Sequence, residues 1–209
     1  MEFEENKKTR VERLHKSVEL FSNSNKKRRE LWVVAEFLST ANVTYTEEEL
    51  QHLHDDPPDV SFRDCRFEVM EILDDGRKRH DECKKELCRA IAANNESELY
   101  LTETWEQESL SLSEVLSDAA KKLQVIKGDK YRDTVKADLD VLIYVNKKKI
   151  TIDDEDFELT EPISSSLSNW RSVSLVFNQR NNKGRVCVAH AQESAPSFIQ
   201  AIVGRAIYE

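Results

Sequence analysis

The chain has 209 residues and a net charge of −9, and 34% of its residues are charged against 39% that are hydrophobic. This length suits one domain, or one domain with an extension, while the negative charge weighs against a protein that coats nucleic acid by bulk attraction. The charged first residues, the lack of a long apolar run and four scattered cysteines exclude a membrane partner and lead us to expect a cytoplasmic protein.

Two helices are predicted near the start of the chain. Residues 1–22 are expected to form an N-terminal helical extension on the main body, because one helical stripe is apolar: Val11, Leu14, Val18 and Phe21. A second helix is expected over residues 26–42, where Glu30 projects onto the apolar face. Glu30 is either an end-of-helix carboxylate that suits the helix dipole or a functional group that reaches the sheet.

A hairpin is predicted over residues 57–73, PPDVSFRDCRFEVMEIL, after a short strand near residues 43–46. With a two-residue turn at Asp64 and Cys65, Val60 pairs with Val69. The apolar face of this hairpin then consists of Val60, Phe62, Phe67 and Val69.

Two acidic residues share the other face of the hairpin. In the predicted register Asp59 and Glu68 are diagonal neighbours, about 7 Å apart at the backbone. Two negative charges about 5 Å apart repel by about 3 kcal/mol at an effective dielectric constant near 20, so a close pair needs a proton, a basic side chain or a metal ion. A simpler interpretation is that Asp59 begins a strand and that Glu68 pairs with Arg63, Arg66 or a helix lysine.

Helices and strands alternate in the rest of the chain. A helix capped by Asp74 or Asp75 is expected after Gly76, and its core-facing stripe is predicted to contain His80, Cys83, Lys84, Leu87 and Ile91. A capping box at Ser111 predicts a further helix. The strand at 136–146 is apolar on both faces, which is typical of a sheet covered by helices, and a hairpin is expected over 172–191. The predicted class is α/β.

This order of elements, together with Pro58, Asp59, Glu68 and Met70, resembles the PD-(D/E)xK restriction-endonuclease-like superfamily. The segments RRELWVVAEFL, PPDVSFRDCRFEVMEILDDGRKRHDE and LDVLIYVN are similar to those of a bacterial family of predicted endonucleases assigned to it. The resemblance implies a single domain over 1–209 with a core of helix, three-strand meander, helix and strand. Helices would flank its mixed sheet, and a C-terminal hairpin would be added to it.

The resemblance also implies a site and an activity. Asp59 and Glu68 would bind Mg²⁺ or Mn²⁺ with the carbonyl of Val69 beside them, and Glu30 would be a third carboxylate. Mg²⁺ prefers oxygen ligands and often uses only one or two protein carboxylates. The implied activity is metal-dependent hydrolysis of DNA phosphodiester bonds. A homodimer that cuts two strands is common in this fold, although no feature of the chain fixes an oligomeric state.

One position departs from the family pattern. Met70 stands where the motif has lysine, and a thioether carries no charge. Lys84 and His80 are the candidates to replace the lysine, because some superfamily members carry it on the next helix. The alternative is a catalytically degenerate relative that acts as a nucleic-acid-binding or protein-interaction module.

Other kinds of site are weaker or excluded. Four widely spaced glycines exclude the P-loop and dinucleotide-binding motifs. His52 and His54 with Asp55 and Asp56 could ligate a transition metal, although a polar loop of this composition is usually only solvated.

Overall fold

A computed structural model describes residues 2–54, 56–100, 110–126, 131–147, 159–178 and 184–208. By its internal contacts the chain divides into two compact units, and the single domain expected from the sequence stays a prediction. Unit 1 contains residues 1–29 and 75–106, and unit 2 contains residues 30–74 and 107–209. Within the described ranges, every helix is too short or too polar to cross a membrane.

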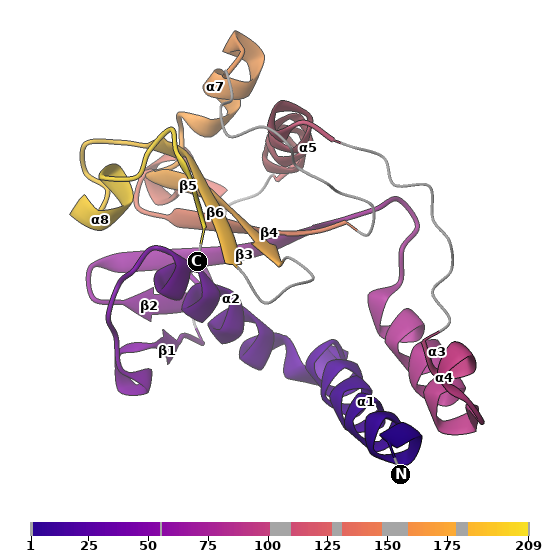
Figure 1. Ribbon diagram of the computed structural model, residues 1–209. Helices are drawn as coiled ribbons and strands as arrows, with labels where there is room; N and C mark the ends of the chain where they lie inside the picture. Colours follow the sequence, from indigo (N-terminus) through magenta and orange to yellow (C-terminus); the bar gives the residue numbers. More distant parts are fainter. Residues whose placement is uncertain are drawn as a thin grey trace. The chain divides into compact units, whose positions relative to one another are not determined.

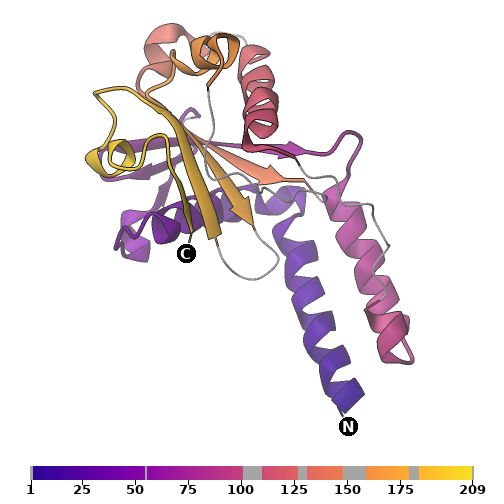
Figure 2. The same ribbon diagram turned by 45° about the horizontal axis from the view of Figure 1, so that its top comes forward.

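Unit 1 is built from two long helices that lie side by side in both views (Figures 1 and 2). Its elements are α1 (Glu2–Leu20), η1 (Asn23–Asn25), α3 (Arg79–Ala92) and α4 (Glu96–Leu99). Its buried core consists of Leu14, Leu87, Ala90, Ala93 and Leu99. The N-terminal helix is therefore confirmed, but its apolar stripe packs against α3, whereas the sequence had suggested the main body.

Helix α3 follows Gly76 as predicted, but its predicted cap and part of its predicted stripe are wrong. The helix begins at Arg79 with Lys78 as its N-cap residue, so neither Asp74 nor Asp75 caps it. Leu87 and Ala90 are buried, whereas Lys84 is exposed and Ile91 is 52% exposed. The apolar face of α3 packs against α1. Because Lys84 and Ile91 lie on another face of the helix, they are exposed to solvent.

Unit 2 is a seven-stranded mixed sheet with helices on both faces (Figures 1 and 2). The strands, in sequence and in sheet order, are β1 (Gln51–His52), β2 (Val60–Phe62), β3 (Cys65–Leu73), β4 (Asp140–Asn146), β5 (Ser172–Asn178), β6 (Gly184–Ala191) and β7 (Ala206–Tyr208). The helical elements are α2 (Lys26–Thr40, whose first four residues count with unit 1), η2 (Glu47–Glu49), α5 (Leu112–Gln124), α6 (Asp133–Lys136), α7 (Glu161–Leu167) and α8 (Ser197–Gln200). Strand β4 is parallel to β3 and β5, and the other neighbours are antiparallel.

Side chains of β4 alternate between two apolar layers. Leu142 and Tyr144 join the layer under α2, while Val141 and Ile143 join the layer under α5 and α7. This arrangement confirms the predicted α/β class, with a mixed sheet flanked by helices and a C-terminal β5–β6 hairpin. Of the turn predicted at NNKG, residues 181–183 lie outside the described residues.

The first strand of the meander differs from the prediction. Residues 43–46 form no strand, and β1 at Gln51–His52 pairs with β2 instead. The carbonyl of Thr44 accepts a hydrogen bond at 3.0 Å from the guanidinium of Arg63, so this segment is held by a side chain.

The β2–β3 hairpin forms in a register two residues away from the predicted one. Phe62 pairs with Cys65 and Val60 with Phe67, so the reversal lies at Arg63 and Asp64. Arg63 has a φ of 52°, and its Nε donates to Glu49 at 2.8 Å. Because a shift of two residues keeps every side chain on its face, the predicted apolar and acidic faces survive.

A candidate metal centre on the β2–β3 hairpin

Three carboxylates meet at the open end of this hairpin. One ligand oxygen each from Asp56, Asp59 and Glu68 lies within 4.8 Å of the other two. Asp59 is 4% exposed and Glu68 is 3% exposed, whereas Asp56 is exposed. The predicted convergence of Asp59 and Glu68 is present in the structure, and the sequence analysis had not placed Asp56 with them.

Asp59 is held by backbone contacts on both sides. Its amide donates to the carbonyl of Phe67 at 3.0 Å, and its carbonyl accepts from the amide of Leu53 at 2.9 Å. Its Oδ2 accepts a hydrogen bond from the amide of Val69 at 2.9 Å. The last pair of the β2–β3 ladder is Val60 and Phe67, so Asp59 and Glu68 each lie one residue beyond it, at the open end of the hairpin.

Glu68 lies on the face of β3 that α5 covers. Strand alternation places it with Met70 and Ile72, which are both in the core layer under α5. The hydroxyl of Tyr131 donates a hydrogen bond to Oε1 of Glu68, and the Tyr131 ring packs edge-on against Trp170 with centroids 5.9 Å apart. Sequence analysis missed Tyr131, because a single tyrosine in a polar segment carries no motif.

This group fits a hard divalent cation. The donor set is made of carboxylate oxygens, which Mg²⁺ and Mn²⁺ prefer. The Val69 amide donates to Asp59 and the Tyr131 hydroxyl donates to Glu68, and these hydrogen bonds orient the two carboxylates. Burying two ionised groups so close together costs free energy unless a positive charge compensates them.

The position where the resemblance expects a lysine is part of the apolar core. Met70 is 9% exposed and packs in the layer under α5. On this face of β3, the polar side chain beside Met70 is therefore Glu68. The hydroxyl of Tyr131, which comes from another segment, donates to that carboxylate.

Glu30 is buried as predicted, but the structure pairs it with a histidine. It is 3% exposed, and its Oε2 lies 2.9 Å from Nε2 of His52. His52 is opposite Val60, which packs under α2, so the pair lies on the α2 face of the sheet. Glu30 is not a member of the carboxylate group, and its catalytic role stays a prediction.

The other predicted candidates belong to other elements of the fold. His80 and Lys84 are on α3 in unit 1, where His80 is half-buried and Lys84 is exposed. Their catalytic roles also stay predictions. The alternative transition-metal site would use His52, His54, Asp55 and Asp56. His52 contacts Glu30, and the ring of His54 lies 6.5 Å from the ring of His52. Asp55 lies outside the described residues.

The two arginines that sequence analysis offered as partners of Glu68 bind other acids. Arg63 donates to Glu49 at 2.8 Å, and Arg66 lies 3.8 Å from Asp138. These contacts weigh against a simple surface ion pair as the explanation for Glu68.

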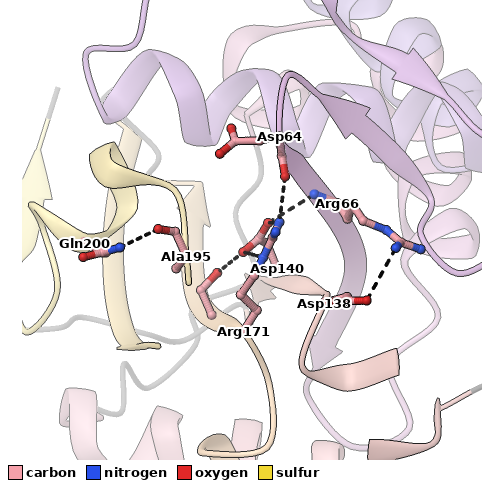
Figure 3. A network of polar contacts seen from close by, with 8 residues as sticks. Asp64, Arg66, Asp138, Asp140, Arg171, Ala195 and Gln200 are labelled. Carbon is pink, nitrogen blue, oxygen red and sulfur yellow. Dashed lines mark hydrogen bonds and ion pairs between the residues drawn. The ribbon is translucent and has the colours of Figure 1, made fainter. Parts of the chain in front are cut away.

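A buried ion pair fixes the closed end of the same hairpin (Figure 3). Asp140 is fully buried and accepts hydrogen bonds from the guanidinium of Arg171, from the hydroxyl of Ser172 at 2.7 Å and from the amide of Arg66 at 3.1 Å. Arg171 also donates to the carbonyl of Asp64 at 3.0 Å. Burial alone would lower the pKa of Arg171, but its hydrogen bonds to Asp140 and the negative charges of Asp140 and Asp64 together outweigh burial and raise the pKa. The network ties the hairpin turn to β4 and β5.

The fold and the carboxylate group define a mixed α/β protein with a candidate site for a divalent cation. Residues 4–209 match the model of a family described as "Putative endonuclease, protein of unknown function", and the chain belongs to that family.

One solved structure is similar over almost the whole chain. It is a protein of unknown function from Pseudomonas aeruginosa strain PAO1 that is described as a member of the monooxygenase superfamily. The two chains are 24% identical, the match covers 98% of this chain and 94% of that one, and the TM-score is 0.65. No curated protein matches the chain. At this identity the likeness supports the fold alone.

Proposed function

We propose that this protein is a metal-dependent nuclease that hydrolyses DNA phosphodiester bonds. The observation that carries the proposal is the carboxylate group, in which Asp59 and Glu68 are buried and lie with Asp56 within 4.8 Å. The family description as endonuclease supports it. The element order also supports a restriction-endonuclease-like core, because α2 is followed by the meander β1–β3, by helices that include α5, and by β4 parallel to β3.

The residues of the hairpin have distinct roles in this proposal. Asp59, Glu68 and Asp56 would hold Mg²⁺ or Mn²⁺, with the carbonyl of Val69 as the further ligand that the resemblance implies. The bound ion would supply Lewis-acid stabilisation of the charge that develops on the phosphoryl oxygens. The Val69 amide orients Asp59, and the Tyr131 hydroxyl orients Glu68.

A proton donor or cation near the scissile phosphate is the open part of this proposal, because Met70 cannot serve. Tyr131 is the candidate from unit 2, since its hydroxyl already lies at Glu68. Lys84, His80 and Glu30 are retained as the candidates that the resemblance implies. Single variants Tyr131→Phe, Lys84→Ala, His80→Ala and Glu30→Gln would rank them by their effect on kcat.

The test is cleavage of supercoiled, linear and single-stranded DNA with Mg²⁺ or Mn²⁺. Wild-type protein is expected to cut at least one substrate, and Asp59→Asn and Glu68→Gln to lose the activity. Glu71→Gln is the matched control, because Glu71 lies on the same strand, accepts a hydrogen bond from Asn146 at 2.7 Å and is outside the carboxylate group. Activity that persists in both site variants contradicts the proposal.

The second candidate is a non-catalytic relative that binds nucleic acid or a protein. It is favoured by the burial of Met70 in the apolar layer, which leaves the strand without the motif's cation. This candidate predicts DNA binding, or binding of a protein partner, without cleavage under any of the metal conditions.

A further inference from the structure

Two basic runs that are distant in sequence belong to the same compact unit. The first is Lys26–Arg29 (KKRR), and the second is Arg77–Arg79 (RKR). Each run alone is typical of a solvated surface. Both belong to unit 1, and its contacts place them at one end of the α1–α3 pair.

The two helices run antiparallel, which sets the position of the second run. At one end Nζ of Lys7, near the start of α1, donates to the carbonyl of Ala93, just after α3, at 2.6 Å. At the other end the guanidinium of Arg79 lies over the ring of Phe21, 3.0 Å from its centroid. The start of α3 therefore lies beside the end of α1.

The first run is folded back onto that same end of α1. Nη1 of Arg29 donates to the carbonyls of Leu20 and Ser22 at 3.2 and 3.3 Å. Arg28 forms an ion pair with Glu19 at 2.9 Å. These contacts hold KKRR next to Phe21, where Arg79 arrives, and we call the two runs together the basic end.

The charge at the basic end is only partly compensated. Arg28 pairs with Glu19 and Arg77 with Glu82, and Asp75 and Asp81 flank the second run in sequence. Lys27 and Lys78 are exposed, and neither forms an ion pair with any residue that the structure describes. The chain as a whole has a net charge of −9, so this cluster of positive charge is a local feature. Its basic side chains repel one another, and a bound anionic partner would reduce that repulsion.

We infer that the basic end binds the phosphate backbone of nucleic acid. Arginine and lysine at close spacing suit phosphate oxygens, and two runs from separate segments allow contacts to several phosphates. The inference rests on the proposed function for the choice of DNA as the substrate, and it assigns the docking surface to unit 1. Such contacts are independent of base sequence and depend strongly on salt.

The experiment measures binding of a labelled random-sequence DNA duplex by fluorescence anisotropy at several salt concentrations. All proteins carry Asp59→Asn and are kept in EDTA, so that no cleavage interferes. The double variant Lys27→Glu/Lys78→Glu is expected to weaken binding about tenfold or more and to reduce the salt slope by about 1 for each lysine that no longer binds a phosphate. Lys85→Glu/Lys122→Glu is the matched control, because both lysines are exposed, lie outside the basic end and change the charge equally.

The outcomes separate this inference from the proposed function. Equal weakening by the two double variants, unchanged affinity in the basic-end variant, or no binding by the parent protein overturns the inference. Weakening in the basic-end variant alone supports it, even if the protein with intact Asp59 never cleaves DNA. Conversely, cleavage could depend on Asp59 while the basic-end variant binds DNA as tightly as its parent. That result would support the proposed function and contradict the inference.

Discussion

The backbone amide of Val69 donates a hydrogen bond to Oδ2 of Asp59 at 2.9 Å, so β3 itself holds the carboxylate that lies close to Glu68. One strand thus carries one acid of the pair and orients the other. This leaves less freedom for the pair to relax apart, and a bound cation would find its ligands preorganised.

The close approach of Asp59 and Glu68 predicts an effect on stability without metal. In EDTA, Asp59→Asn is expected to raise Tm, because it removes a repulsion of up to about 3 kcal/mol for charges about 5 Å apart at an effective dielectric constant near 20. The asparagine oxygen can still accept from the Val69 amide. Thermal unfolding followed by circular dichroism measures the shift.

The same variant is expected to lose stabilisation by metal. Mn²⁺ at about 100 times its Kd would stabilise wild-type protein by about 2.7 kcal/mol, but not Asp59→Asn. Glu71→Gln should respond to Mn²⁺ like wild type. Two results together would contradict a metal site at Asp59 and Glu68. Mn²⁺ would leave the Tm of the wild-type protein unchanged, and Asp59→Asn would have a lower Tm than wild type in EDTA.

Tyr131→Phe is predicted to weaken the site from outside the ligand set. Removing the hydroxyl takes a donor from buried Glu68, which costs about 1–3 kcal/mol, and loss of an orienting partner typically lowers metal affinity by about 10–100-fold. Calorimetric titration with Mn²⁺ measures the affinity. Tyr45→Phe is the control, because Tyr45 is half-buried and packs against Phe62 away from the carboxylate group; equal affinities in the two variants would refute the role of Tyr131.

Asp140 and Arg171 are predicted to be essential for stability. Asp140→Asn or Arg171→Met leaves one member of a buried pair without its counter-charge, which costs about 3–5 kcal/mol. The exposed pair of Arg66 and Asp138, also drawn in Figure 3, is expected to contribute about 0–1 kcal/mol. Urea denaturation compares Arg171→Met with Arg66→Met, and similar losses would contradict the assignment.

His190 is predicted to make stability depend on pH below neutrality. Burial lowers the pKa of His190, and a hydrogen bond with the backbone of Trp170 opposes this only in part. The unfolded chain, with a histidine pKa of about 6.5, therefore takes up a proton before the folded protein does. The free energy of unfolding should fall as pH drops through about 6.5 toward the lower folded pKa.

The variant His190→Gln tests this prediction. Its free energy of unfolding should depend less on pH between about pH 5.5 and 7.5, a range above that in which carboxylates titrate. His15→Gln, at an exposed position of α1, should keep the wild-type slope. A slope that survives in His190→Gln would assign the effect to another group.

Sequence patterns predicted the layered part of the fold because their signals are local. Apolar residues on both faces of β4 and alternation along β2 and β3 report burial directly. The hairpin register was wrong by two residues, because the turn depends on Arg63, whose positive φ is supported by contacts to Glu49 and Thr44. The faces were still predicted correctly, since the error was an even number of residues.

The site was predictable only as far as the motif reached. Asp59 and Glu68 share a hairpin, so strand alternation brings them together. Tyr131 comes from 63 residues away, and no local pattern in its segment indicates that contact. Lys84 was assigned to a buried stripe because α3 was expected on the sheet, whereas its apolar residues pack against α1.

The most direct test of the central claim is a crystal of the protein grown with Mn²⁺ and measured for anomalous scattering. We predict a peak bound by carboxylate oxygens of Asp59 and Glu68, at the distance of about 2.0–2.2 Å that such hard cations adopt, and no peak in Asp59→Asn crystals. An ion bound elsewhere, or no ion at these carboxylates at saturating Mn²⁺, would contradict the claim.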